Sequence, residues 1–418
     1  MLQDKLFREK RDFINDFDFG KNTAQIFDDM LNRSVPFYGE IQRIVGEMAG
    51  YFAVGNTNLY DLGCSTCETL LAIEDINKYC CNNSIPIQFE CVSKCAYGRA
   101  QEAIKATDDF HDQNVSIVVG YDWGSMLDAC DYQSKKYGMI IVSPYCNSPV
   151  HRDVYKHIFQ LTPITFQQTK VIAKTMVELG FLETVVFMRD FQDASGYIED
   201  EFQKYYEGLG GTIIDTVEYI LSTDPTHMSI ELSNLEEAVN GSYAAIFYPE
   251  NLDFRVFDNL KYHPNLHNYT WFATSEVHSN TTSTLSVYPE LVEIKLIHPY
   301  LDDTPDQSIE IYREINDLYL QEFGYNLTRY SGNIYDAVWL GGLTVIEIGE
   351  YNNESFINAF PIVAKDYSGV SGNCSLDQYG DRLQGNYIIY NYVLRGESVY
   401  LSEIGYYDSE KSNNTLKK

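Results

Sequence analysis

The stretch from Val115 to Val150 constrains the fold more than any other part of the chain. It contains a β-branched run, a glycine turn, a helix-like segment and a second apolar run that ends at Ser143-Pro144. Two parallel strands joined by a helix form a βαβ unit, and its two loops lie at the same edge of the sheet. The sequence therefore predicts an α/β fold with ligand-facing loops at that edge.

The charge balance excludes several classes of partner. With 418 residues, 44% of them hydrophobic, the chain is long enough for two or three domains. Its 60 acidic and 30 basic residues give a net charge of −30, which argues against nucleic acids and anionic membrane surfaces. No apolar run is long enough to span a membrane. The charged N-terminus also lacks the apolar core of a secretory signal.

Nine cysteines raise the question of a metal or redox site. Cys64 and Cys67 form a CxxC pair, which is typical of zinc and redox sites. Because no second CxxC and no histidine cluster follows at zinc-finger spacing, we expect no metal site. The odd count leaves at least one cysteine unpaired, or paired between molecules.

Three short sequence motifs stand out near the N-terminus: Phe27-Asp28-Asp29-Met30, Arg33-Ser34-Val35-Pro36-x-Tyr38 and Tyr60-Asp61-Leu62-Gly63-Cys64-Ser65. Through them, residues 1–66 resemble the first part of carboxy-S-adenosylmethionine synthases, relatives of class I methyltransferases. The resemblance implies that Tyr38, Gly63 and Ser65 contact S-adenosylmethionine. It is expected to end near residue 66, because the family's next glycine is here Cys67 and no acidic residue for the ribose follows. We therefore expect a fragment without chemistry and no cofactor.

A second set of sequence motifs continues to about residue 405. The helix-like Thr69–Tyr79, the glycine and Ser-Pro turns of the opening stretch, and the segment His157–Pro163 keep one order and spacing. They resemble branched-chain amino acid substrate-binding proteins of ABC transporters, which have the periplasmic binding protein type I fold. The resemblance implies two doubly wound, Rossmann-like lobes that close on a ligand by a hinge. His157–Pro163 is then the first crossing between the lobes.

This resemblance implies a division of the chain. Residues 1–57 form the N-terminal helical, methyltransferase-like fragment; residues 58–160 and 285–370 form the first lobe; residues 161–284 and 371–405 form the second; and 406–418 are a polar tail. Residues 86–92 are predicted as a first-lobe strand. The strand predicted at residues 59–62 stands where the family's first strand belongs.

A free amino acid brings a carboxylate and an ammonium, and a closed cleft must satisfy both. Helix N-termini supply amides and a favourable dipole for the carboxylate, and an acidic side chain suits the ammonium. The candidates are Ser125, Asn147 and Ser148 as polar contacts, Glu276 and Asp193 as acids, and Tyr121, Trp123, Tyr145 and Phe247 as pocket walls. Each has an ordinary alternative as a turn residue, a surface carboxylate or a core aromatic.

We expect a solute-binding component of an ABC importer that takes a small ligand, an amino acid above all, and works with an ABC permease. No nucleophile elbow, P-loop or HExxH motif is present, so we expect no enzyme. One alternative is an S-adenosylmethionine-dependent enzyme built on residues 1–66, and a second is a ligand-sensing module without transport. The family implies an extracellular or periplasmic address. If Met1 is the true start, the missing signal implies a cytoplasmic one.

Overall fold

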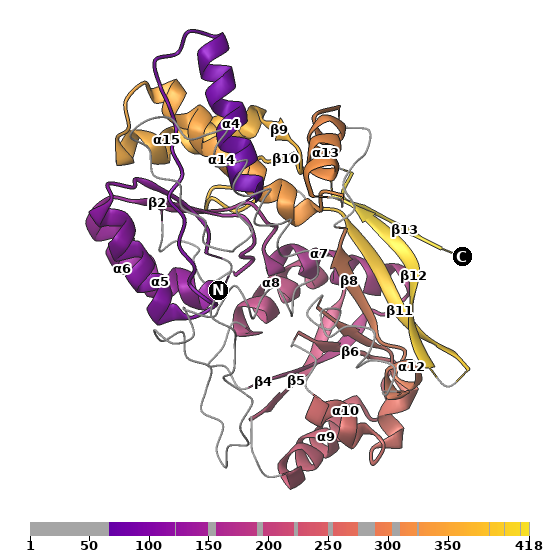
Figure 1. The fold of residues 1–418 in the computed structure, drawn as a ribbon. Coiled ribbons are helices and arrows are strands. Elements are labelled where there is room, and N and C mark those ends of the chain that lie inside the picture. The colour runs from indigo at the N-terminus through magenta and orange to yellow at the C-terminus, as the bar shows by residue number, and fades with distance from the viewer. Residues whose placement is uncertain are drawn as a thin grey trace, which may run out of the picture. The chain divides into compact units, whose positions relative to one another are not determined.

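The computed structural model describes residues 67–121, 123–148, 156–189, 195–220, 225–249, 254–274, 289–302, 310–323, 326–383, 385–396, 398–409 and 411–417. The chain divides into two units, residues 1–62 and 63–418, and all described residues belong to the second (Figure 1). The predicted N-terminal segment 1–57, the strand at 59–62 and the Tyr38, Gly63 and Ser65 positions lie outside the described residues.

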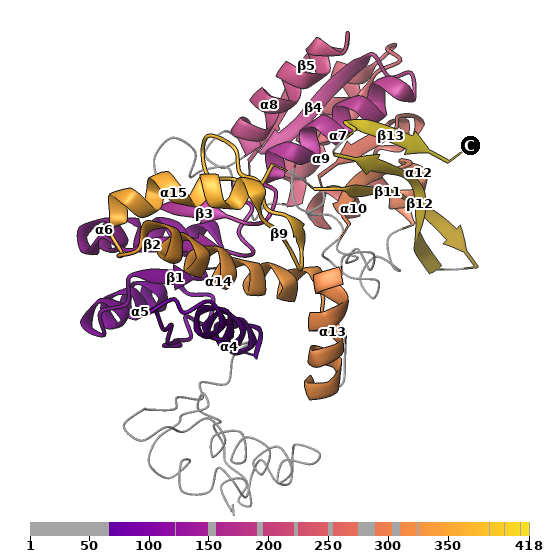
Figure 2. The ribbon, with the colours of Figure 1, turned by 90° about the horizontal axis from the view of Figure 1, so that it is seen from above.

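The first lobe contains a parallel sheet of order β1-β2-β3, formed by β1 (Ile117–Val119), β2 (Ile140–Ser143) and β3 (Ile158–Gln160). Helix α6 (Gly124–Tyr137) joins β1 to β2, so the predicted βαβ unit is confirmed. Alternate strand residues face opposite sides, as the pleat requires. One side packs on α6 and α5 (Ala100–Asp112), and the other on α14 (Arg329–Ile348) and α15 (Asn353–Asp366) (Figure 2).

The predicted helix after residue 68 is confirmed as α4 (Cys67–Asn82), but the predicted strand at 86–92 is wrong. These residues run as irregular backbone in the described structure. A strand needs a neighbour for its backbone groups, and none of the described strands pairs with these residues. The backbone N–H and C=O of Phe89 instead bond to the side chain of Asn77.

The second lobe is built on an eight-stranded sheet of order β13-β12-β11-β8-β7-β6-β4-β5. Five strands are parallel: β4 (Glu183–Arg189), β5 (Thr212–Tyr219), β6 (Ala245–Tyr248), β7 (Trp271–Ala273) and β8 (Ile297–Leu301). Three later strands extend the sheet in antiparallel fashion: β11 (Tyr387–Arg395), β12 (Ser398–Asp408) and β13 (Asn413–Leu416). Figure 1 shows these late strands, in yellow, beside β8.

Helices cover both faces of this sheet. Helices α7 (Thr165–Glu178) and α8 (Ser195–Gly208) pack on one face. The opposite face is covered by α9 (Pro225–Val239), α10 (Phe254–Leu260), the short η2 (Pro264–Asn268) and α12 (Glu290–Glu293). A parallel sheet covered on both faces gives strands that are apolar at nearly every position, and β6 is buried along its whole length.

The predicted lobe boundaries need two corrections. Strand β8 was assigned to the first lobe within residues 285–370, but it pairs with β7 and β11 in the second-lobe sheet. Its buried Ile297 and Leu301 complete the core beneath α7, which accounts for its place. Residues 406–418 are likewise not a free polar tail, because β13 pairs with β12 and Asn414 Nδ2 donates to Thr175 Oγ1 on α7 at 3.2 Å.

The chain then returns to the first lobe. Helix α13 (Glu310–Phe323) packs with α4 and α14 around Tyr312, Tyr319 and Tyr335. The short strands β9 (Ser368–Gly369) and β10 (Gly372–Asn373) follow α15, and the segment after them leads back to β11. The two sheets are thus joined by segments at Leu161–Ile164, beyond Leu301, and at 374–386.

Candidate functional site

The loops after β1 and β2 lie at one edge of the first-lobe sheet, as expected. Ser143, the last residue of β2, fixes one loop to the other: its Oγ donates to the carbonyl of Tyr121 at 2.7 Å and accepts from the amide of Cys146 at 3.1 Å. The amide of Gly120 also donates to Val142 O at 3.1 Å. Because Gly120 has φ 147°, a region that favours glycine, the chain turns sharply out of β1.

Two predicted contacts lie at the start of α6. Trp123 stands at the N-cap position of the helix and is 62% exposed, and Ser125 is exposed in the first turn. The side chain of Trp123 makes no capping hydrogen bond with the helix. The first-turn amides and the helix dipole therefore favour an anionic group at this position. The Trp123 ring lies over the backbone of Gly98, at 3.6 Å from where a Cβ would stand.

Three further candidates follow β2. Tyr145, Asn147 and Ser148 are half-buried. The Tyr145 ring lies 5.6 Å from that of Tyr330, centroid to centroid. Tyr330 occupies the first turn of α14 and was not predicted, because its place at this edge depends on a helix far along the chain. The structure therefore places Trp123 and Ser125 at the start of α6, and Tyr145, Asn147 and Ser148 on the loop after β2.

The prediction that Tyr121 and Phe247 line the ligand pocket is corrected, because both side chains lie in the hydrophobic cores. The hydroxyl of Tyr121 bonds to Thr107 Oγ1 at 2.6 Å and to Ala103 O at 3.2 Å, both on α5. Burial raises the pKa of this phenol. Phe247 is fully buried in β6, with its ring 4.1 Å from that of Phe202. Neither side chain forms an open pocket wall in this structure.

The acidic candidates cannot be placed. Asp193 and Glu276 follow β4 and β7 in the sequence, and both lie outside the described residues. The strands themselves are parallel and end at Arg189 and Ala273, so the segments that carry the two acids leave the same edge of the second-lobe sheet. Their roles as ammonium partners stay predictions.

No described group of three or more His, Cys, Asp and Glu side chains has an arrangement suited to a metal ion. The seven cysteines with described side chains are all free thiols. Burial raises the pKa of the Cys91 and Cys130 thiols, which favours their protonated form.

Two surface hollows lie away from these loops. One of about 450 Å³ lies between the edge strand β5 and α9, where it is lined by Asp215, Glu218, Glu231 and Glu237 among others. Charged side chains of this kind protect an exposed strand edge from pairing. The other, of about 220 Å³, is lined by Lys135, Lys156 and His157 at the amino end of β3.

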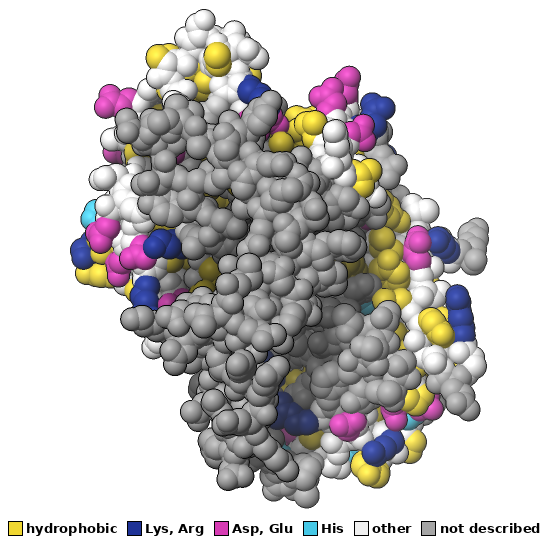
Figure 3. Space-filling model, in the orientation of Figure 1, with side chains coloured by type: hydrophobic (Ala, Val, Ile, Leu, Met, Phe, Trp, Pro, Cys, Tyr) yellow, Lys and Arg dark blue, Asp and Glu magenta, His cyan; other side chains and the backbone are white. Residues whose placement is uncertain are grey.

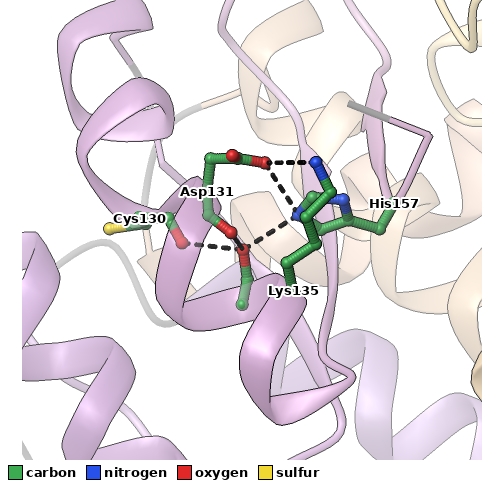
Figure 4. Close-up of polar contacts among 5 residues, drawn as sticks. Cys130, Asp131, Lys135 and His157 are labelled. Carbon is green, nitrogen blue, oxygen red and sulfur yellow. Dashed lines mark hydrogen bonds and ion pairs between the residues drawn. The ribbon is translucent and has the colours of Figure 1, made fainter. Parts of the chain in front are cut away.

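His157 has the polar contacts of a buried structural residue (Figure 4). Its Nε2 lies 2.9 Å from Ser134 Oγ and 3.5 Å from Asp131 Oδ1. The Ser134 hydroxyl also donates to the backbone carbonyls of Cys130 at 2.7 Å and Asp131 at 3.1 Å. A hydrolase relay needs the acid and the serine on opposite ring nitrogens, and here both face Nε2. Burial lowers the pKa of His157 to about 4, against the opposing charge of Asp131.

The described part of one face fits the charge argument from the sequence. On the face drawn in Figure 3, described lysine and arginine side chains are scattered among acidic and apolar ones. None of the described helices combines the length and the apolar character needed to cross a bilayer.

Comparisons with known proteins support both resemblances and extend the first. A carboxy-S-adenosyl-L-methionine synthase from Methylococcus capsulatus is 27% identical over 228 residues, 51% of this chain and 86% of that protein. Another, from Shewanella sediminis, is 39% identical over 212 residues, 50% of this chain and 82% of that protein. The expectation that this similarity ends near residue 66 is therefore wrong, because such alignments continue well beyond it.

Solved structures with the same fold are substrate-binding proteins. One from Desulfitobacterium hafniense, in complex with Leu, gives a TM-score of 0.56 at 17% identity, covering 82% of this chain and 96% of that one. The branched-chain amino acid protein from Streptococcus pneumoniae, in complex with isoleucine, gives 0.55 at 18% identity, covering 81% and 93%. At these identities the likeness shows the fold, which confirms the two-lobed type I architecture.

The family model described as "Receptor family ligand binding region" matches residues 69–394. This range includes the β1 and β2 loops and most of both sheets. The chain therefore belongs to the receptor family ligand binding region, and about half of it is also related to carboxy-S-adenosyl-L-methionine synthases.

Proposed function

We propose that the chain binds a free amino acid between its two lobes and serves as the solute-binding receptor of an ABC importer. The observation that carries the proposal is the pair of loops joined by Ser143 at the carboxyl edge of β1 and β2. That edge is where ligands bind in open α/β sheets. The family match and the leucine and isoleucine named for two proteins of the same fold support this ligand class.

The chemistry of the edge suits a zwitterion. The N-terminus of α6 favours the carboxylate, and Ser125, Asn147 and Ser148 are our candidates for its polar contacts. Glu276 and Asp193 are our candidates for the ammonium. Trp123 and Tyr145 offer apolar surface for the side chain of the ligand. The mechanism would be hinge closure of the lobes around the ligand. An ABC permease in the cytoplasmic membrane would recognise the closed form from outside the cytoplasm.

The similarity to carboxy-S-adenosyl-L-methionine synthases favours a second candidate, an S-adenosylmethionine-dependent enzyme. Tyr38, Gly63 and Ser65 would then contact the cofactor. Under the first proposal no cofactor is needed. A ligand-sensing module without transport is a third candidate, which would bind the amino acid but would not support uptake.

Equilibrium dialysis separates the first two candidates. The purified chain is dialysed against L-leucine, L-isoleucine, L-valine and S-adenosylmethionine, each radiolabelled, with a mixture of the other amino acids as competitor. Retention of one branched-chain amino acid and not of S-adenosylmethionine is expected. Retention of S-adenosylmethionine alone would overturn the proposal.

A further inference from the structure

A buried polar cluster holds the loop from Ser143 to Ser148 against the first segment that joins the lobes. Three carbonyls of this loop accept hydrogen bonds from residues 160–165, which comprise this segment and the residue on either side of it. Pro144 O accepts from Thr162 Oγ1 at 2.6 Å, Asn147 O from the amide and Oγ1 of Thr165 at 3.0 and 3.2 Å, and Ser148 O from Gln160 Nε2 at 3.0 Å. The donors are at most 6% exposed.

The joining segment is held in turn by the last one. Gln160 pairs with the returning chain through its amide, which donates to Gly380 O at 2.9 Å, and its carbonyl, which accepts from the Arg382 amide at 3.0 Å. Its side chain also donates to Asp381 Oδ1 at 2.7 Å. The first and the last of the three segments that cross between the lobes therefore lie side by side at Gln160 and Arg382.

Arg382 lies at the centre of the cluster and is 1% exposed. Its Nη1 donates to Leu161 O and to Asn333 Oδ1, each at 3.0 Å. Asn333 connects Arg382 to the loop, because its Nδ2 donates to Pro144 O at 3.1 Å and to Thr162 Oγ1 at 3.2 Å. A continuous path of hydrogen bonds thus runs from the last crossing, through α14, to the candidate ligand loop.

Ser371 joins Arg382 to a buried carboxylate. Its Oγ accepts from Arg382 Nη1 at 3.0 Å and donates to Asp336 Oδ2 at 2.5 Å. Buried charged groups persist only where neighbouring groups satisfy them. This arrangement fixes the guanidinium rigidly, so that it can position Asn333 rather than move with solvent.

From this geometry we infer that Thr162, Asn333 and Arg382 are positioning residues for the ligand: they hold the Ser143–Ser148 loop in its binding shape and tie that shape to the lobe crossings. The inference rests on the proposed function for its ligand. Closure of the lobes moves the crossing segments, and the loop is bonded to them. Ligand affinity is therefore set partly by groups that lie behind the loop.

Thr162 gives the sharpest test, because valine matches its shape and serine restores the hydroxyl. Hydrogen–deuterium exchange is measured on the ligand-free full chain for the amides of residues 145–148, together with L-leucine affinity by calorimetry. We expect Thr162→Val to speed exchange at these amides and to weaken leucine binding, each by about two- to tenfold. Thr162→Ser should restore both.

Thr184→Val is the matched control. Thr184 is fully buried, and its hydroxyl donates to Ala245 O at 3.1 Å inside the second-lobe sheet, away from the cluster. It should lower the melting temperature as Thr162→Val does, without changing exchange at residues 145–148. Thr165→Val is a second variant expected to loosen the same loop.

The exchange result decides the inference even if leucine does not bind, in which case the proposed function fails separately. Faster exchange at residues 145–148 in Thr162→Val, reversed in Thr162→Ser, supports the positioning role. Unchanged exchange there in both Thr162→Val and Thr165→Val, or an equal change in Thr184→Val, would overturn it.

Discussion

The side chain of Asn77 makes the two backbone hydrogen bonds to Phe89 that a neighbouring strand would otherwise make. Its Nδ2 donates to Phe89 O at 2.9 Å, and its Oδ1 accepts from Phe89 N at 2.8 Å. Both backbone groups of Phe89 are thereby satisfied without a ladder. Asn77 thus anchors the irregular segment after α4 to the rest of the first lobe.

Replacement of Asn77 should therefore be costly. Asn77→Leu removes two partly buried hydrogen bonds and leaves a backbone donor and acceptor unpaired, which should lower the free energy of unfolding by about 1–3 kcal/mol. Guanidinium denaturation measures this loss. Asn83→Ala is the control, since Asn83 is exposed and its Nδ2 makes one bond to Tyr79 O. Equal losses in the two variants would show that Asn77 has no special role.

The sequence predicted the local units of the fold well because its signals are local. The β-branched run before Gly120 and the helix ended by Gly138, which has φ 66°, specify the βαβ unit by themselves. The lobe assignment of Ile297–Leu301 failed for a different reason. An apolar strand can enter either sheet, and its pairing with β7 and β11, which are distant in the sequence, decides between them.

His157 should make stability depend on pH. Its pKa is lowered by burial to about 4, from an ordinary value near 6.5, so the folded state prefers the neutral ring. The contribution of the neutral His157 ring to the free energy of unfolding is complete above pH 6.5. It is lost as pH falls toward 4, because the unfolded chain then binds the proton first. At pH 5 the loss relative to pH 7 should be about 2 kcal/mol.

His157→Gln tests this, since glutamine keeps a donor but does not titrate. Denaturation at pH 7 and pH 5 should show a smaller loss of stability in the variant than in the wild type. His111→Gln, at an exposed histidine on α5, is the control and should behave like the wild type. The same pH dependence in wild type and His157→Gln would contradict the burial argument.

Replacement of the Asp336 carboxylate by the corresponding amide should destabilise the protein. The carboxylate accepts from Tyr367 Oη at 2.8 Å, from the amides of Val370 and Ser371 at 2.8 and 2.7 Å, and from Ser371 Oγ. Asp336→Asn turns an NH₂ group toward these donors, and we expect a loss of about 2–4 kcal/mol. Thermal unfolding checks it, with the exposed Asp317→Asn as control. A melting temperature equal to that of the control would contradict the contacts described.

The candidate site was predictable only where loops follow strands directly. Parallel strands bring their carboxyl ends together, which is how Ser125, Asn147 and Ser148 could be grouped from sequence. Tyr121 and Phe247 failed because an aromatic beside a strand end packs inward or outward according to neighbours such as Thr107 and Phe202. Arg382 gave no local signal, since its partners Leu161 and Asn333 are distant in the sequence.

The central claim is that the chain binds a zwitterionic amino acid, and calorimetric titration of L-leucine into wild type and Glu276→Gln tests it most directly. A carboxylate facing the ammonium gives a charge-assisted bond, and truncating such a buried pair costs about 2–5 kcal/mol. The account predicts one leucine per wild-type chain and an affinity weakened roughly thirty- to several-thousand-fold in Glu276→Gln. Ser125→Ala should weaken binding only about two- to tenfold. The absence of binding to wild type, or an affinity unchanged in Glu276→Gln, would contradict it.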